Sequence, residues 1–116
     1  MLNINTVNTI LYCKKWQETV TFYQTGLQLE PTFSNDWFME FKLNDAARLS
    51  IANEAQASIK SGQGKGITLS IAVDDIEATH AFLVQAGLEP TAIKELWGSN
   101  VLYLYDPEGN RLEFWS

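Results

Sequence analysis

The C-terminal segment of the chain places a carboxylate between a basic and an aromatic side chain. Residues 103–116 read YLYDPEGNRLEFWS, and the alternation of side chains along a strand puts Arg111, Glu113 and Trp115 on one face. Either this face meets water and the charge of Glu113 is ordinary, or the face lines a site. In a site, Glu113 would act as a general base or as the counter-charge of a cationic ligand.

The same segment contains a turn that would hold this face in place. Residues 106–109, DPEG, suit a tight turn, because proline presets one backbone dihedral and glycine tolerates the bend. The flanking residues 100–105 and 111–116 alternate and are rich in aromatic side chains. The segment therefore predicts a β-hairpin.

Length and charge limit the classes of function. The 116 residues predict one domain, long enough for a real core. A hydrophobic fraction of 46% and a charged fraction of 19% are typical of a soluble globular protein. The net charge of −6 argues against a general binder of nucleic acid or of anionic membranes, because such binders neutralise phosphates. The acidic balance favours a cationic or neutral ligand.

The sequence also predicts a compartment. No run of about 18 apolar residues is present, so we expect no membrane span. The first ten residues, MLNINTVNTI, lack the basic and then apolar layout of a signal peptide. Cys13 is the only cysteine, so it cannot form an intrachain disulfide. These features predict a protein of the reducing cytoplasm.

The order of predicted strands and helices occurs twice. Each half begins with a strand, continues through one helix that ends at a glycine, and closes with three more strands. A polar, glycine-bearing loop joins the halves. The first half consists of strand 7–13, helix 16–26 ending at Gly26, and strands 27–33, 36–43 and 47–53. The loop covers residues 54–66. The second half consists of strand 66–73, helix 74–87, begun by Asp74 or Asp75 and ended by Gly87, and strands 90–96, 100–105 and 111–116.

The two halves are also alike residue by residue around their helices. Trp16 matches Ile76 and Phe22 matches Phe82, while the segment TGLQLEP resembles AGLEP. Self-similarity of this kind predicts one structural unit used twice. The repeated unit has the order βαβββ.

Two long stretches resemble a known family. VDDIEATHAFLVQAGLEP followed by LYLYDPEGNRLEFW is similar to the second half of proteins of the glyoxalase/bleomycin resistance/dioxygenase superfamily, also called the vicinal oxygen chelate superfamily. ILYCKKWQETVTFYQTGLQLEP with WFMEFKLNDAARLSIA resembles the first half. The resemblance covers essentially the whole chain, and its motifs are specific for the fold rather than for one chemistry.

The resemblance implies an α+β fold with a single glyoxalase-like domain over residues 1–116. It would contain one βαβββ module over about 1–55, a linker over 54–66 and a second module over about 66–116. In the family, two such modules form a curved mixed sheet, or cup, with the helices on its outside.

Side-chain alternation divides each predicted strand into a core face and a cup face. Val7, Leu11 and Cys13 are expected in the core, as is Ile67. The cup face combines aromatic and polar side chains, as ligand pockets do; the alternative is that this face merely meets water. The predicted ligand-binding residues are Asn8, Phe38, Glu40, Arg48, Ser50, Thr68, Tyr103, Tyr105 and Trp115, beside Glu113 as the one catalytic candidate.

Metal enzymes of this superfamily hold their ion with four residues of the cup, usually histidine and glutamate. By resemblance these positions fall on Asn8, Ser50 (or Arg48 if the alignment slips), Thr68 and Glu113. Only Glu113 is a good ligand for a divalent transition metal, since neutral Asn, Ser and Thr side chains are poor substitutes. The one histidine, His80, lies in the second predicted helix. We therefore predict no metal and no other cofactor.

Three functions fit these residues. The first is a metal-independent binding protein of the bleomycin resistance type, which holds a small cationic or aromatic ligand in the cup. The alternative is a glyoxalase-related lyase or isomerase that uses Glu113 as acid or base. The second alternative is an interaction module. The resemblance also implies a homodimer in which both chains complete or flank each site, with Asn8 near the contact.

Overall fold

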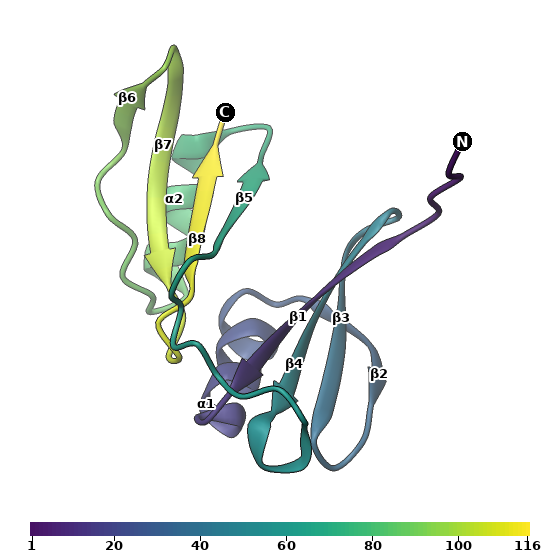
Figure 1. The fold of residues 1–116 in the computed structure, drawn as a ribbon. Helices are drawn as coiled ribbons and strands as arrows, with labels where there is room; N and C mark the ends of the chain where they lie inside the picture. The colour runs from purple at the N-terminus through teal and green to yellow at the C-terminus, as the bar shows by residue number, and fades with distance from the viewer. The chain divides into compact units, whose positions relative to one another are not determined.

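A computed structural model describes residues 1–116. The chain divides into two compact units, Met1–Gly62 and Gln63–Ser116. Each contains one four-stranded sheet and one α-helix that lies on a face of that sheet (Figure 1).

The first unit has the order βαβββ. Its opening strand, VNTILYC, is rich in the β-branched and aromatic residues that suit a sheet. The elements are β1 (Val7–Cys13), α1 (Trp16–Thr21), a π-helical turn η1 (Phe22–Gly26), β2 (Glu30–Ser34), β3 (Phe38–Asn44), β4 (Ala47–Asn53) and a 3-10 turn η2 (Glu54–Gln56).

The helix predicted over residues 16–26 changes its geometry at Phe22. From there the backbone is π-helical, and Leu27 N donates to Phe22 O, five residues back, at 2.9 Å. The left-handed residue that follows is Gln28, with φ 58°, and not Gly26. The end of the helical segment was predicted, but the glycine does not supply the reversal.

The second unit repeats the order. Its elements are β5 (Thr68–Ala72), α2 (Ile76–Gln85), β6 (Lys94–Leu96), β7 (Ser99–Tyr105) and β8 (Arg111–Trp115). Asp75 is the N-cap of α2, because its carboxylate accepts from Ala78 N at 3.0 Å. Gly87, with φ 81°, follows the C-terminal end of the helix, as predicted.

The strand predicted over residues 90–96 is shorter than expected. β6 contains only three residues, yet Thr91 still contacts the neighbouring strand. Thr91 N donates to Tyr103 O at 2.9 Å, and Thr91 Oγ1 accepts from Tyr103 N at 2.8 Å. A threonine side chain thus replaces the backbone carbonyl that a longer strand would have offered, and the ladder is interrupted here.

The strand order is the same in both sheets. It is β1-β4-β3-β2 in the first unit and β5-β8-β7-β6 in the second. In each sheet the first and last strands of the module pair in parallel, and the other pairs are antiparallel. The parallel pair needs a crossover connection, which begins with the helix. The predicted α+β fold of two βαβββ modules is confirmed.

The predicted hairpin at the C-terminus joins β7 to β8. Asp106 Oδ1 accepts from Glu108 N at 3.0 Å and from Asn110 N at 2.9 Å, and Asp106 Oδ2 accepts from Asn110 Nδ2 at 3.0 Å. Gly109 has φ 95°, a conformation that suits glycine. This turn fixes where Arg111 and Glu113 emerge on β8.

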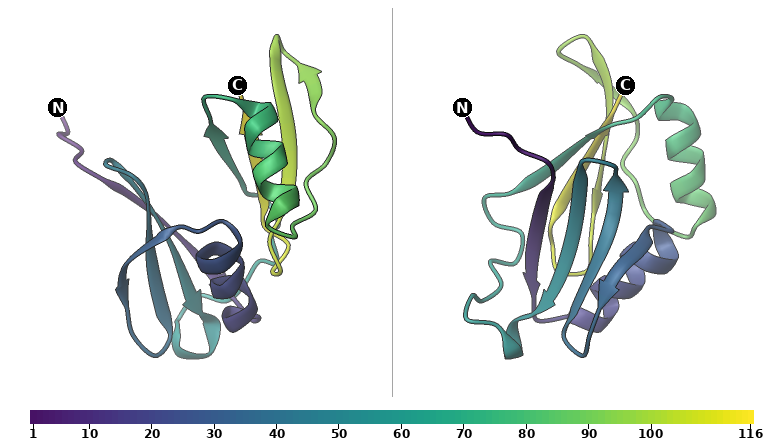
Figure 2. Two further views of the ribbon diagram at one scale, coloured as in Figure 1. Left: turned by 180° about the vertical axis from the view of Figure 1, so that it is seen from behind. Right: turned by 90° about the vertical axis from the view of Figure 1, so that its right-hand side faces the viewer.

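The core of each unit lies between its helix and one face of its sheet (Figure 2). Its largest buried side chains include Tyr23, Phe41, Leu49 and Ile51 in the first unit and Leu83, Leu102, Leu104 and Leu112 in the second. Leu11 and Cys13 are buried as predicted.

Two residues predicted to be buried are exposed. Val7 is 56% exposed, because it begins β1, an edge strand that has only β4 as a neighbour. Ile67 is 37% exposed, because β5 begins one residue later, at Thr68. Alternation assigns a residue to a face, but it does not show whether anything covers that face at the end of a strand.

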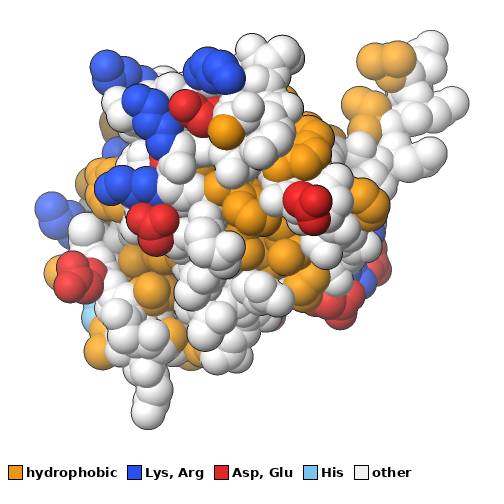
Figure 3. Space-filling view, turned by 90° about the horizontal axis from the view of Figure 1, so that it is seen from below, with side chains coloured by type: hydrophobic (Ala, Val, Ile, Leu, Met, Phe, Trp, Pro, Cys, Tyr) orange, Lys and Arg blue, Asp and Glu red, His pale blue; other side chains and the backbone are white.

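Neither α1, with 6 residues, nor α2, with 10, could span a membrane. On the face drawn in Figure 3, acidic side chains lie beside basic ones, and hydrophobic side chains are exposed between them.

Candidate functional site

The second sheet presents ordered rows of side chains on the face opposite α2. Directly paired residues of neighbouring strands point to the same side of a sheet. The register therefore shows which side chains lie next to each other on this face. The pairs are Thr68 with Arg111, Ser70 with Glu113, Ala72 with Trp115, Tyr103 with Glu113, and Tyr105 with Arg111.

Glu113 is a half-buried carboxylate with one oxygen in use. Ser70 Oγ donates to Glu113 Oε1 at 2.6 Å, a short bond of the kind that charged acceptors make. Glu113 Oε2 has no hydrogen-bond partner in the chain, and no lysine or arginine forms an ion pair with Glu113. The carboxylate is therefore oriented but not neutralised.

Glu113 lies in an open hollow of about 260 Å³, named here the Glu113 hollow. Most of its wall is apolar, and three of its side chains are aromatic, which is the composition of a small-molecule site. The lining residues are Ser70, Leu96, Trp97, Ser99, Val101, Tyr103, Glu113 and Trp115.

Trp97 forms the tip of the β6–β7 hairpin, where it is 99% exposed. Trp97 and Gly98 both have positive φ, 54° and 78°, as the two-residue type I′ turn requires. A bulky residue rarely adopts this conformation, whereas asparagine or glycine does so readily. Strained residues of this kind concentrate at functional sites.

Arg111 is held by two neighbours beside this hollow. Its Nε donates to Thr68 Oγ1 at 3.0 Å, and its guanidinium carbon lies 4.6 Å from the centre of the Tyr103 ring. Guanidinium groups are attracted to aromatic faces at this distance. Arg111 thus contacts threonine and tyrosine and forms no ion pair with Glu113.

A second hollow, named here the Arg111 hollow, has a volume of about 370 Å³. Three glycines and a threonine contribute to its wall, and no acidic residue does. The lining residues are Gly64, Gly66, Ile67, Thr68, Tyr105, Gly109 and Arg111. Tyr105 therefore lines this hollow and not the Glu113 hollow.

In the first unit, polar side chains from all four strands form one hydrogen-bonded row. Ser50 Oγ donates to Asn8 Oδ1 at 2.8 Å, and Asn8 Nδ2 donates to Glu40 Oε2 at 3.4 Å. Thr32 Oγ1 donates to Glu40 Oε1 at 2.7 Å. Both oxygens of Glu40 are thus occupied, which distinguishes this carboxylate from Glu113.

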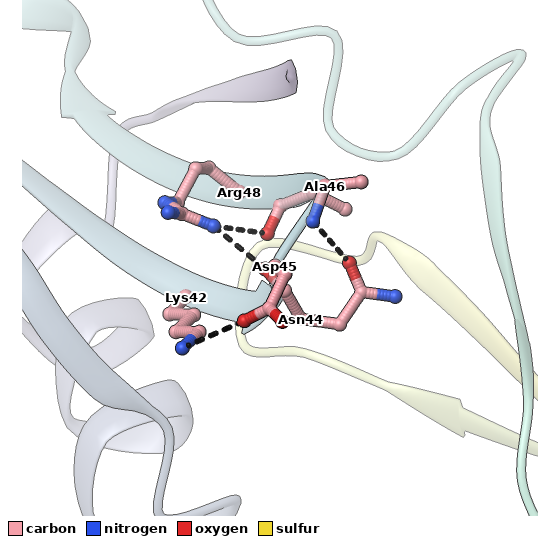
Figure 4. Close-up of polar contacts among 6 residues, drawn as sticks. Lys42, Asn44, Asp45, Ala46 and Arg48 are labelled. Carbon is pink, nitrogen blue, oxygen red and sulfur yellow. Dashed lines mark hydrogen bonds and ion pairs between the residues drawn. The ribbon is translucent and has the colours of Figure 1, made fainter. Parts of the chain in front are cut away.

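Arg48 lies at the turn between β3 and β4. Its Nη1 donates to Asn44 O at 2.7 Å and to Ala47 O at 3.1 Å (Figure 4). Lys42 pairs with Asp45 of the same turn at 3.1 Å. The guanidinium of Arg48 thus holds backbone carbonyls of its own turn.

Phe38 belongs to an aromatic cluster of the first unit. Its ring centre lies 5.7 Å from that of Trp37 in an edge-on arrangement and 6.2 Å from that of Phe33. Such pairs stabilise a sheet beyond the area they bury.

The structure thus brings some predicted residues together within each unit. Asn8, Glu40 and Ser50 share the polar row, while Arg48 and Phe38 lie at the turn and in the aromatic cluster. Glu113, Tyr103 and Trp115 line the Glu113 hollow, and Thr68 and Tyr105 line the Arg111 hollow.

Among the other residues that line these hollows, Ser70, Arg111 and Trp97 have the side chains most able to contact a ligand, and none of them was among the predicted ligand-binding residues. Ser70 and Arg111 share the sheet face with Glu113, so alternation already placed them there. Trp97 precedes Gly98 between two strands, and a glycine at such a place favours a turn. The hydrogen-bond partners of Ser70 and Arg111 follow only from the register between strands.

The four positions that the resemblance assigns to a metal do not fit one. Ser50 and Asn8 bond to each other, and the hydroxyl of Thr68 already accepts from Arg111 Nε. No group of three or more His, Cys, Asp or Glu side chains in the chain could hold a metal ion. Glu113 alone does not make such a site.

Comparison with known proteins decides the family. The model of the Glyoxalase/Bleomycin resistance protein/Dioxygenase superfamily matches residues 3–114. The chain belongs to this superfamily. A comparison with curated proteins found no match.

Solved structures of glyoxalase-superfamily proteins have the same fold. A lactoylglutathione lyase from Agrobacterium tumefaciens is 17% identical, with a TM-score of 0.76 over 94% of this chain and 90% of that chain. A glyoxalase/bleomycin resistance protein/dioxygenase from Nocardioides is 16% identical, with a TM-score of 0.80 over 99% and 83%. An antibiotic binding protein from Streptomyces is 15% identical, with a TM-score of 0.76 over 98% and 94%. At these identities the comparisons show that this chain shares the fold of those proteins. The function of this chain has to be inferred from its own side chains.

Proposed function

We propose that this superfamily member binds a small cationic, aromatic molecule in the Glu113 hollow without a metal. The observation that carries the proposal is the state of Glu113. Its carboxylate is oriented by Ser70 at 2.6 Å, keeps one oxygen without a partner, and faces a wall with three aromatic side chains.

The chemistry of the hollow favours a cation. A half-buried carboxylate attracts a positive group, and the faces of Trp and Tyr rings attract it as well. Trp97, Tyr103 and Trp115 supply such rings around Glu113. A ligand that is both aromatic and cationic would satisfy the free oxygen of Glu113 and cover apolar wall at once.

The position of Arg111 also supports a cationic ligand at Glu113. Arg111 is on the same sheet face but bonds to Thr68 and lies over Tyr103, so Glu113 keeps its charge available for a ligand. Among structures of the same fold is the Streptomyces protein described as antibiotic binding. That protein shows that the fold can serve to bind a small molecule.

The experiment compares a charged probe with a neutral one of similar size. Benzylammonium and benzyl alcohol have the same ring, and binding is followed by the fluorescence of the tryptophans. Glu113→Gln should weaken benzylammonium by about 1–3 kcal/mol, roughly tenfold to a hundredfold, because the charge-assisted contact is lost. Benzyl alcohol should bind to both proteins equally.

The matched control is Glu89→Gln, which removes an exposed carboxylate that lines neither hollow. This variant should bind benzylammonium as the unsubstituted protein does. Equal affinity of the Glu113→Gln variant and the unsubstituted protein for benzylammonium would remove Glu113 from the proposed role.

A further inference from the structure

The two arginines of the chain occupy equivalent places and are used differently. Arg48 pairs with Asn8 of the first strand in its unit, and Arg111 pairs with Thr68 of the first strand in the other. Arg48 Nη1 donates to two carbonyls of its own turn. The terminal nitrogens of Arg111 have no hydrogen-bond partner in the chain.

Arg111 is nevertheless held in place. Its Nε bond to Thr68 and the contact of its central carbon with the Tyr103 ring restrain the guanidinium, so ordering it for a ligand costs little further entropy. Every buried side-chain nitrogen or oxygen has a hydrogen-bond partner, so the free terminal nitrogens of Arg111 are open to solvent. A guanidinium presented in this way offers a fork of donors that matches a carboxylate or a phosphate.

The Arg111 hollow has the composition of an anion site. It contains no acidic residue, although the chain as a whole has a net charge of −6. Its glycines allow close approach of a ligand to the backbone. Gly64 and Gly109 also bring two backbone segments together: a Cβ on Gly64 would lie 2.0 Å from Gly109 O. This contact holds the loop that forms one wall.

We propose that Arg111 binds the anionic group of a dipolar ligand whose cationic group binds Glu113; the cationic half of this inference rests on the proposed function. The two residues are two positions apart on one strand, which separates them by about 7 Å. Tyr103 links the two hollows. It lines the Glu113 hollow, and its ring contacts the guanidinium of Arg111, which lines the other hollow. The ligand class is therefore an aromatic molecule with an ammonium group and a carboxylate at opposite ends.

Three probes with one ring test the two halves separately. 4-(Aminomethyl)benzoate carries both charges, benzylammonium only the positive one, and benzoate only the negative one. Their dissociation constants are measured by NMR titration against the unsubstituted protein and against Glu113→Gln, Arg111→Gln and Arg111→Lys variants.

The dipolar probe should bind the unsubstituted protein more tightly than either singly charged probe. Arg111→Gln should weaken benzoate and 4-(aminomethyl)benzoate by about tenfold or more, because the charge-assisted bonds to the carboxylate are lost. Arg111→Lys should recover part of this affinity, since lysine keeps the charge but not the fork. Glu113→Gln should weaken the dipolar probe without weakening benzoate.

Lys94→Gln is the matched control, because it removes an exposed positive charge that lines neither hollow. This variant should bind benzoate normally, and the circular dichroism of each variant should match that of the unsubstituted protein. Benzoate binding that does not change in either Arg111 variant would overturn the anion site. If Glu113→Gln leaves the affinity for benzylammonium unchanged while Arg111→Gln weakens benzoate, the proposed function is overturned and the anion site is retained.

Discussion

Glu113 and Ser50 occupy equivalent positions in the two modules and differ in what surrounds them. Ser50 is fully buried and donates to Asn8, within a row in which both oxygens of Glu40 are occupied. Glu113 receives one bond, from Ser70, and Arg111 beside it keeps free donors. The first module therefore satisfies its own polar groups, while the second leaves an acceptor and a donor for a ligand.

A substitution at Trp97 separates the stability of the hairpin from ligand binding. Trp97→Asn should stabilise the fold by about 1 kcal/mol or leave it unchanged, because asparagine suits the first position of a type I′ turn. The same variant should weaken benzylammonium several-fold, because one aromatic wall of the Glu113 hollow is lost. Chemical denaturation and the probe titration measure the two effects.

Gly98→Ala supplies the opposite control for this hairpin. It strains the turn, since Gly98 has φ 78°, but it keeps the indole, and nothing lies within 4 Å of the added methyl group. It should lower stability and preserve binding by the folded protein. A Trp97→Asn variant that binds benzylammonium as tightly as the unsubstituted protein would show that the indole makes no contact with the ligand.

At the scale of elements, the close contact between the 63–66 loop and the 106–110 turn determines the shape of the Arg111 hollow. Gly64→Ala should destabilise the protein by about 2–4 kcal/mol, because the new methyl group meets a backbone carbonyl and the residue has φ 81°. Gly87→Ala has the same φ but open space around it, so it should cost only about 1–2 kcal/mol. If the two variants lose the same free energy of unfolding in denaturant, the 63–66 loop moves away from the turn without an energetic cost.

Local chemistry made most of the elements predictable from the sequence. Asp75 and Gly87 are the start and stop signals of α2, and the DPEG turn is held by the side chain of Asp106. The π-helical turn after Thr21 was not predictable, because it depends on which carbonyl of its own segment Leu27 N reaches. The short β6 was not predictable, because the Thr91 hydroxyl replaces a backbone carbonyl beside β7.

The candidate site was predictable only in part for a related reason. Alternation placed Glu113, Tyr103 and Trp115 on one face, but it could not show that Ser70 orients the carboxylate. It also could not show that Tyr105 lines a different hollow, or that Arg111 is left without an anionic partner. Those facts follow from register and from side-chain contacts between strands that are distant in sequence.

At the scale of the whole molecule, we propose a homodimer. Each sheet is open, and β1 is an edge strand whose free backbone groups can pair with another chain. Apolar side chains before and within this strand are exposed, namely Met1, Leu2, Ile4 and Val7. Light scattering at micromolar concentration should therefore give about twice the chain mass of 13.1 kDa. The mass of a single chain would exclude the dimer at that concentration.

The most direct measurement of the central claim uses the four tryptophans as reporters. Each indole N–H gives its own NMR resonance, and Trp97 and Trp115 line the Glu113 hollow, while Trp16 donates to Ile51 O in the first unit. Titration with benzylammonium should shift the resonances of Trp97 and Trp115 with one dissociation constant, and Glu113→Gln should reduce both shifts together. Shifts confined to Trp16 and Trp37, or unchanged by Glu113→Gln, would contradict a cation site at Glu113.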